Sequence, residues 1–205
     1  MAYSPLLQDL LDALRCLPGV GPRSAQRMAF RLLEHDRDAG RRLASAMTAA
    51  LDTITECTRC RMLAETELCW ICAASGRDSS TVCIVESPAD VIAVEDSAAY
   101  NGHYFVLMGR LSPLDGVGPD ELGLGLLEKE FAEGRIKEII IATSATVEGE
   151  ATAGYLSSLA RNYNIRASRI AHGVPLGGEL EFVDSSTLSL AIAGRKNLGD
   201  DVAGE

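Results

Sequence analysis

The chain has 205 residues, of which 47% are hydrophobic and 23% charged, so it can bury one sizeable core or two smaller ones and is not a disordered chain. Its net charge of −10 argues against nucleic-acid binding over the whole surface, because phosphate binding needs clustered cations. The sequence contains no apolar run of about eighteen residues and no signal-like N-terminus, so we expect a cytoplasmic protein without a membrane partner.

The charge is distributed unevenly along the chain. Residues 1–53 contain seven arginines and six acidic residues, whereas the rest contains twelve basic and twenty-three acidic residues. We therefore expect any nucleic-acid contact to start in the N-terminal quarter, which alone has a net positive charge.

Two helices are predicted in this N-terminal quarter. Ser4-Pro5 followed by leucines at helical spacing predicts a helix over about Pro5–Cys16, with Cys16 as a small core residue. Pro18-Gly19 ends it, and a second helix is expected to continue to about Leu33. Glycines at this turn let the backbone approach a ligand closely, and the amides that open the second helix favour an anion.

The segment Leu14–Arg27 resembles a helix-hairpin-helix motif, which holds the DNA backbone through loop amides without reading bases. Three arginines that follow the turn recur at a spacing of four, which places them along one face of the second helix, as phosphate contacts require. A solvated helix face beside an ordinary turn is the alternative. The expected DNA-binding residues are Gly19, Gly21, Arg23, Arg27 and Arg31.

Four cysteines form two closely spaced pairs. Cys57 and Cys60 are separated by two residues, as are Cys69 and Cys72, and eight residues lie between the pairs. Two such pairs surround one tetrahedral Zn²⁺ and leave no open position, so we expect a structural metal rather than a catalytic one. An iron–sulfur cluster or a redox dithiol would use the same residues.

From about Thr81 onward, short apolar runs alternate with helical segments. This alternation predicts an α/β fold in which helices cover a parallel sheet. The expected strands are 82–85, 104–107, 138–142 and 166–170, and the expected helices are 89–97, 119–133 and 150–162.

The segments Val85–Ser87 and Ala142–Ala151 resemble a Toprim domain, the module of topoisomerases and DnaG-type primases. In its catalytic members, a glutamate and an Asp-x-Asp pair hold magnesium; here Ser144 and Thr146 stand at the aspartate positions. We therefore expect no enzyme activity, since hydroxyls bind Mg²⁺ weakly. The remaining glutamates are predicted to contact a partner or a weakly bound Mg²⁺, or else only to solvate strand ends and cap a helix. They are Glu86, Glu148 and Glu150.

The order of these motifs, followed by Gly177–Asp184, resembles the RecR family over essentially the whole chain. The resemblance implies a recombination mediator that acts with RecO and RecF to load a recombinase at single-stranded gaps during DNA repair. It also implies binding to single-stranded, double-stranded and gapped DNA, a homodimer or homotetramer ring, and association with the bacterial nucleoid during repair.

We therefore expect four regions, an α/β Toprim-type sheet being the largest: 1–53 (helix-hairpin-helix), 54–78 (four-cysteine zinc finger), 80–175 (Toprim) and 176–205 (Walker-B-like oligomerisation segment). In the last region, Phe182, Leu188 and Leu190 are predicted to pair subunits, and His172 just before it is predicted to be structural. Two alternatives stay open: a Mg²⁺-dependent Toprim nuclease or topoisomerase-like enzyme, and a zinc interaction module that does not bind DNA.

Overall fold

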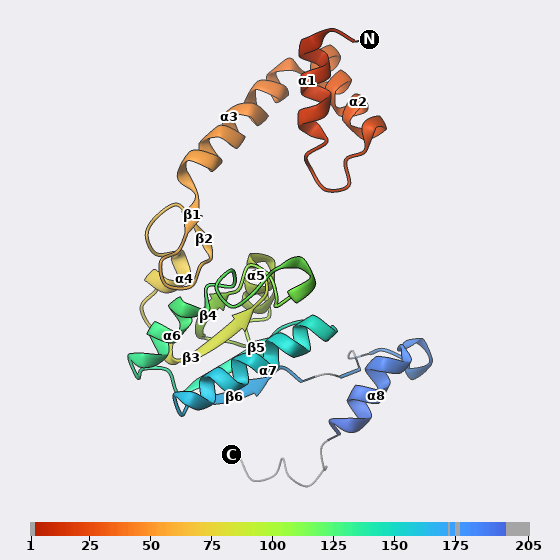
Figure 1. Cartoon of the computed structure of the whole chain (residues 1–205). Helices are drawn as coiled ribbons and strands as arrows, with labels where there is room; N and C mark the ends of the chain where they lie inside the picture. Colours follow the sequence, from red (N-terminus) through yellow and green to blue (C-terminus); the bar gives the residue numbers. More distant parts are fainter. Residues whose placement is uncertain (1–2, 172, 175–176, 196–205) are drawn as a thin grey trace. The chain divides into compact units, whose positions relative to one another are not determined.

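The computed structural model describes residues 3–171, 173–174 and 177–195 (Figure 1). The chain divides into two compact units, Met1–Thr55 and Glu56–Glu205, and each is described by itself. Within the described residues, no helix combines the length and the hydropathy needed to cross a membrane. His172 and residues 175–176 and 196–205 of the predicted regions lie outside the described residues.

The first unit is helical, and its elements are α1 (Pro5–Leu14), α2 (Pro22–Phe30), the π-helical turn η1 (Arg31–His35) and α3 (Arg37–Thr53). Helices α1 and α2 each begin with a proline, whose missing N–H costs nothing at the first helical position. The core is small, and its fully buried side chains are Leu11, Ala25 and Ala29. Cys16 is exposed, so its prediction as a core residue was wrong.

The second unit starts at the second residue of β1 (Thr55–Glu56), which pairs with β2 (Leu63–Ala64) in a short two-stranded sheet, and the one-turn helix α4 (Trp70–Ala73) follows. A four-stranded parallel sheet comes next, with strands in the order β4-β3-β5-β6. Its strands are β3 (Asp78–Val85), β4 (Gly102–Val106), β5 (Glu138–Ala142) and β6 (Arg166–Arg169). The parallel sheet predicted from the sequence is therefore confirmed.

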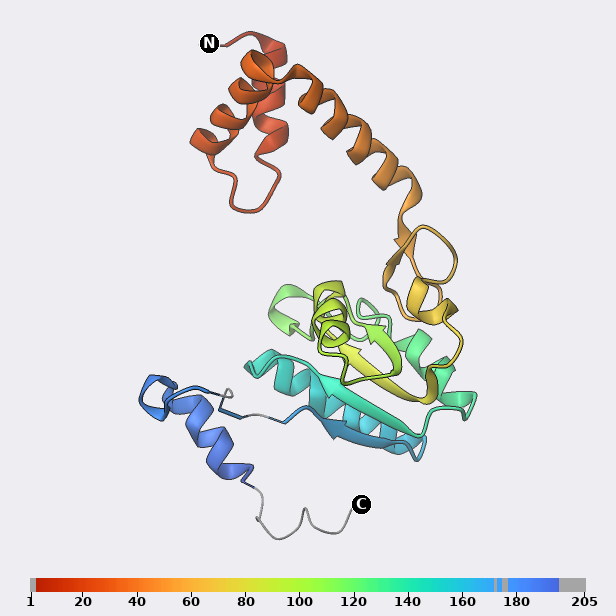
Figure 2. The same ribbon diagram turned by 180° about the vertical axis from the view of Figure 1, so that it is seen from behind.

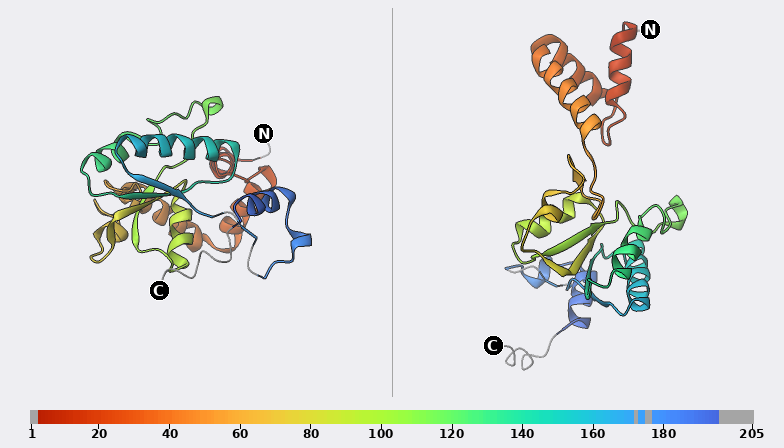
Figure 3. Two further views of the ribbon diagram at one scale, coloured as in Figure 1. Left: turned by 90° about the horizontal axis from the view of Figure 1, so that it is seen from below. Right: turned by 90° about the vertical axis from the view of Figure 1, so that its left-hand side faces the viewer.

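Helices cover both faces of this sheet, as the left view of Figure 3 shows for α7 and α5. Their bounds are α5 (Pro88–Asp96), α6 (Leu124–Ala132) and α7 (Val147–Asn162). Alternate residues of β3 point to opposite faces: Ile84 packs with α6 and α7, whereas Cys83 packs against α5 and the cysteine cluster. The zinc-finger segment thus shares a core with one face of the sheet.

Two helix starts differ from the prediction. Helix α6 begins at Leu124 and not near 119, because Gly123 precedes it with a φ of 68° and a turn occupies the preceding residues. Helix α7 begins at Val147 and not near Glu150, because the hydroxyl of Thr146 accepts a hydrogen bond from the Gly149 N–H (3.1 Å) and caps the helix.

The C-terminal part contains a 3₁₀ turn, η3 (Leu180–Phe182), and helix α8 (Ser185–Ala193), both visible in Figure 2. Asp184 caps α8 by accepting hydrogen bonds from the N–H groups of Ser186 (3.0 Å) and Thr187 (2.9 Å). Hydrogen bonds from the Ser186 and Thr187 side chains lower the pKa of Asp184. The carboxylate of the Walker-B-like segment therefore has a structural use within the chain.

Candidate zinc centre and nucleic-acid interface

The four predicted zinc ligands meet in one buried cluster. The Sγ atoms of Cys57, Cys60, Cys69 and Cys72 all lie within 4.8 Å of one another, and those of Cys60 and Cys69 are 3.5 Å apart. Four sulfurs at about 2.3 Å from a tetrahedral Zn²⁺ lie about 3.8 Å apart. The donor set and its spacing therefore fit one Zn²⁺ with no open coordination position.

The electrostatics of the cluster also call for a cation. A hydrogen bond with Cys72, together with burial, raises the pKa of the Cys60 thiol, and burial raises that of Cys69 to about 11. Burial opposes ionisation of Cys57 as well, but backbone N–H groups outweigh it and lower its pKa to about 7. Four adjacent thiolates repel one another, so all four ionise together only around a positive charge.

The zinc segment is attached to the Toprim sheet by backbone and side-chain contacts. The carbonyl of Cys60 accepts a hydrogen bond from the Val106 N–H of β4 (2.9 Å). Arg61 has a φ of 65°, and its guanidinium donates to the carbonyls of Leu107 (3.1 Å) and Leu122 (2.5 Å). A lone arginine beside a zinc ligand carries no sequence signal for this contact, and sequence reasoning missed it.

A second attachment involves Arg77 at the end of the zinc segment. Its guanidinium pairs with Glu95 of α5, and Glu95 also accepts a hydrogen bond from the Tyr104 hydroxyl (2.6 Å). Arg77 also lies 5.7 Å from the ring centre of Trp70, one of the two residues between Cys69 and Cys72. The hydrogen-bonded Arg77 lowers the pKa of Glu95. These contacts fix the segment that holds the metal against the sheet.

The predicted DNA-binding turn connects α1 to α2. Gly19 has a φ of 78°, a conformation that favours glycine, whereas Gly21 has an ordinary φ of −80° and open space where a side chain would stand. The fold of this unit therefore requires a glycine at position 19 but not at position 21. The Arg23 and Ser24 N–H groups lie in the first turn of α2, where amides have no acceptor within the helix. This arrangement is suited to a phosphate.

The three predicted arginines are exposed. Arg23 and Arg27 lie on α2, while Arg31 opens the π-helical turn, so the three are spread over about 80° at 100° per residue. None of them has a salt bridge to a carboxylate of a described residue, unlike Arg15 and Arg41, which pair with Asp12 (3.0 Å) and Asp38 (2.7 Å). Their charges are therefore available to a ligand.

The predicted acidic site lies at the carboxyl ends of β3 and β5. Glu86 follows β3, and its Oε1 accepts hydrogen bonds from the N–H and the hydroxyl of Ser144, both 2.8 Å long. The Arg110 guanidinium lies 3.6 Å from its other oxygen. Ser144, which was predicted to replace a metal-binding aspartate, thus holds the Glu86 carboxylate by two hydrogen bonds.

The other two glutamates lie in the first turn of α7 and are not gathered around Glu86. Glu150 pairs with Arg169 of β6, and Glu148 is half-buried. Among the described residues, the four cysteines form the only group of three or more His, Cys, Asp or Glu side chains whose ligand atoms lie within 4.8 Å of one another. The structure therefore does not bring the three glutamates together as a preformed site for a divalent cation.

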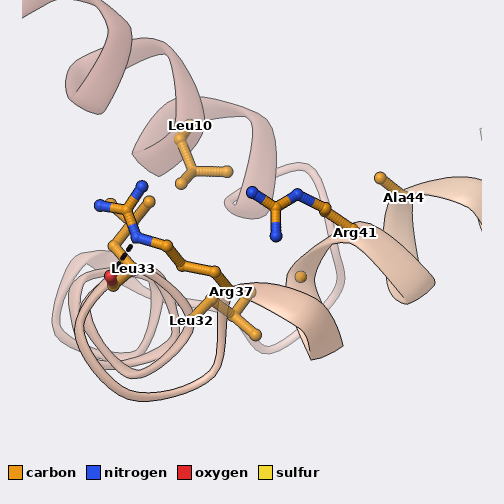
Figure 4. Close-up of a pocket in the computed structure, with 7 residues that line it drawn as sticks. Leu10, Leu32, Leu33, Arg37, Arg41 and Ala44 are labelled. Atoms are coloured by element: carbon orange, nitrogen blue, oxygen red, sulfur yellow. Dashed lines mark hydrogen bonds between the residues drawn. The ribbon is translucent and has the colours of Figure 1, made fainter.

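An apolar pocket of about 330 Å³ lies in the first unit between α1, η1 and α3 (Figure 4). Its lining residues are Leu10, Leu32, Leu33, Arg37, Gly40, Arg41 and Ala44. Helix α3 has no buried residue, and Leu43, Met47 and Leu51 are exposed on it at a spacing of four, which places them along one face. Apolar side chains at such a spacing are typical of a helix that pairs with another helix.

The helical hairpin, the four-cysteine site and the parallel Toprim sheet together define a zinc-containing nucleic-acid protein of the helix-hairpin-helix and Toprim class. Family models match in the same order: RecR, helix-hairpin-helix at residues 7–51; the RecR zinc finger domain with four cysteines at 54–74; Toprim domain at 80–171; and RecR, C-terminal at 173–196. The chain belongs to the RecR family, and a role in DNA repair and recombination follows from this membership. The cysteines form the site of one structural Zn²⁺.

Proposed function

We propose that the chain is a non-catalytic recombination mediator, which binds the DNA backbone and acts with RecO and RecF to load a recombinase at single-stranded gaps. One observation carries the proposal: Arg23, Arg27 and Arg31 are exposed without a carboxylate partner among the described residues, and Arg23 lies in the first turn of α2, where the amides have no acceptor within the helix. Such a surface contacts phosphates without reading bases, so it accepts single-stranded, double-stranded and gapped DNA.

The chemistry of the Toprim edge supports a role without catalysis. Ser144 and Thr146 have hydroxyls in place of carboxylates. The Ser144 hydroxyl donates a hydrogen bond to Glu86, and the Thr146 hydroxyl accepts one from the Gly149 N–H at the start of α7. Two-metal chemistry on phosphates needs clustered carboxylates. We propose that Glu86, Glu148 and Glu150 instead form a contact surface for RecO, with Mg²⁺ bound weakly at most.

The exposed apolar surfaces support self-association. The face of α3 that carries Leu43, Met47 and Leu51, together with the pocket of Figure 4, forms one candidate interface. The C-terminal segment offers a second, because Phe182 is 80% and Leu190 is 42% exposed. Two separate interfaces on one chain allow a homodimer to close into a homotetramer ring around DNA. In such a ring, each chain pairs with one neighbour through the first interface and with the other neighbour through the second.

The regions we assign to these roles are 1–53 for DNA, 54–78 for zinc, 80–175 for partner contact and 176–205 for subunit pairing. We propose that the protein acts in the cytoplasm and associates with the nucleoid during repair, since its substrate is chromosomal DNA. The acidic charge of residues 54–205 would keep DNA from the remaining surface.

A loading assay tests this function. A gapped DNA substrate is covered with single-strand-binding protein, and DNA-dependent ATP hydrolysis by the recombinase is followed in the presence of RecO and RecF. Adding the zinc-loaded chain should shorten the lag, and the double variant Arg23→Glu/Arg27→Glu should not. Arg135→Ala is the matched control, because Arg135 already pairs with Glu130 and Glu133. An unchanged lag with folded wild-type protein would contradict the proposal.

A further inference from the structure

A second apolar groove lies on the Toprim part of the chain, between the segment that follows β4 and helix α7. Its volume is about 380 Å³, and its apolar lining consists of Leu111, Pro113, Val117, Pro119 and Tyr155. None of these residues belongs to the zinc cluster, the helical hairpin or the acidic edge. The function proposed above therefore names no residue of this groove.

The wall of the groove is held in a defined shape. Ser112 and Val117 exchange two backbone hydrogen bonds, 3.0 and 2.9 Å long, and the Ser112 hydroxyl donates to Asp115 (2.6 Å). The Leu111 N–H donates to the Thr152 hydroxyl of α7 (2.9 Å), which fixes the segment to the helix. A preformed groove requires little ordering when it binds, so a short peptide segment can bind it with useful affinity.

The tip of the same segment presents an apolar side chain to solvent. Leu114 lies in the 3₁₀ turn η2 (Pro113–Asp115) and is 99% exposed, and Gly116 closes the turn with a φ of 72°. Tyr155 on the other side of the groove is 39% exposed. A rigid loop that holds a leucine in water beside an apolar groove is typical of a protein interaction site.

The charge around the groove selects the kind of partner. Residues 110–129 contain four acidic residues, Asp115, Asp120, Glu121 and Glu128, and two basic ones, Arg110 and Lys129, so the segment has a net charge of −2. This negative potential disfavours the phosphates of DNA. It favours a positively charged protein segment.

We propose that this groove binds a short segment of a partner protein in which one large apolar side chain is flanked by lysine or arginine. The apolar side chain fills the space between Val117 and Tyr155, and the cations lie near Asp120 and Glu121. Leu114 adds apolar contact at the edge. The proposal does not depend on DNA binding by the first unit.

Selection from a phage-displayed library of random twelve-residue peptides on immobilised, zinc-loaded full-length protein tests the proposal. Enriched sequences should contain a large apolar residue beside lysine or arginine. The synthetic peptides should bind Tyr155→Ser or Leu114→Ser at least about tenfold more weakly than wild type, as expected when a buried apolar contact is lost. Asp120→Lys should also weaken binding, and added salt should reduce this difference.

Two substitutions on α5 serve as matched controls. Ile92 is 42% exposed and Asp96 is exposed, and neither lines the groove, so Ile92→Ser and Asp96→Lys should bind the peptides as wild type does. Thermal unfolding of each variant establishes that it is folded. The proposal is overturned if no peptide is enriched, if enriched peptides are acidic, or if they bind Tyr155→Ser as tightly as wild type.

The same variants separate the other possible occupants. A lower mass of Leu114→Ser in light scattering would identify the groove as an interface between copies of this chain. Weaker binding of Leu114→Ser to single-stranded DNA in a gel shift would identify it as a nucleic-acid surface. Either result overturns the proposal, whereas unchanged mass and unchanged DNA affinity support it.

Discussion

Removing two arginines from the helical hairpin should change the salt dependence of DNA binding by a predictable amount. Arg23 and Arg27 are exposed and have no salt bridge to a carboxylate of the described residues, so each is free to displace a cation from DNA. Each phosphate contact contributes about 0.7 to the slope of log affinity against log salt for a single strand. The variant Arg23→Ala/Arg27→Ala should therefore have a slope about 1.4 smaller than wild type.

Fluorescence anisotropy of a labelled single-stranded oligonucleotide over about 50–200 mM salt measures this slope. Over that fourfold range, the ratio of wild-type to variant affinity should fall by about sevenfold, as the two lost contacts would give. Arg135→Ala should keep the wild-type slope, because its guanidinium is paired with Glu130 and Glu133 in the second unit. Equal slopes for wild type and the double variant would refute the assignment of these arginines to phosphate contacts.

Three further predictions concern zinc, the turn and acid stability. Chelation of zinc, or Cys57→Ser, should lower the Tm by at least about 10 °C in calorimetry, because several kcal/mol of metal binding are lost; a folded Cys57→Ser protein of unchanged Tm would refute a structural zinc. Gly19→Ala should lower the free energy of unfolding by about 1–2 kcal/mol, since the φ of Gly19 is 78°. Gly21→Ala should leave the free energy of unfolding unchanged and weaken DNA binding. A destabilised Gly21→Ala protein with wild-type DNA affinity would contradict the close approach of a phosphate to Gly21. Arg77 lowers the pKa of Glu95, so this ion pair stabilises the fold above about pH 4.3, and its stabilisation is lost as the pH falls through the lowered pKa. Denaturant titrations should show that Glu95→Gln is less stable than wild type at pH 7 and that its stability depends less on acid. Parallel stability–pH profiles of wild type and variant would exclude this role.

Much of the fold could be predicted because local patterns determine it. The spacing of the paired cysteines predicts their cluster, and the apolar runs 82–85 and 138–142 fall within β3 and β5, where strands buried on both faces need such runs.

The start of α7 was missed because Thr146 was considered only as a replaced metal ligand. Threonine is also a preferred residue at a helix N-cap, and here the Thr146 hydroxyl caps α7.

Other features depend on contacts that no local pattern reveals. Arg61 binds carbonyls of Leu107 and Leu122, which are far from it in the sequence. Cys16 was predicted in a core because it follows an apolar stripe, but α1 ends at Leu14 and the small core of the first unit does not reach beyond the helix. The predicted acidic site assumed that the strand ends bring all three glutamates together, whereas Glu150 is turned to Arg169.

The most direct test of the central claim is light scattering of the zinc-loaded protein mixed with gapped duplex in the presence of Mg²⁺, followed by electrophoresis of the recovered DNA. We predict a complex with the mass of a dimer or tetramer plus one DNA, which dissociates as salt is raised and releases DNA of unchanged length. A monomer that leaves the DNA unbound would contradict the mediator account, and shortened or extended DNA would restore the Toprim enzyme despite Ser144 and Thr146.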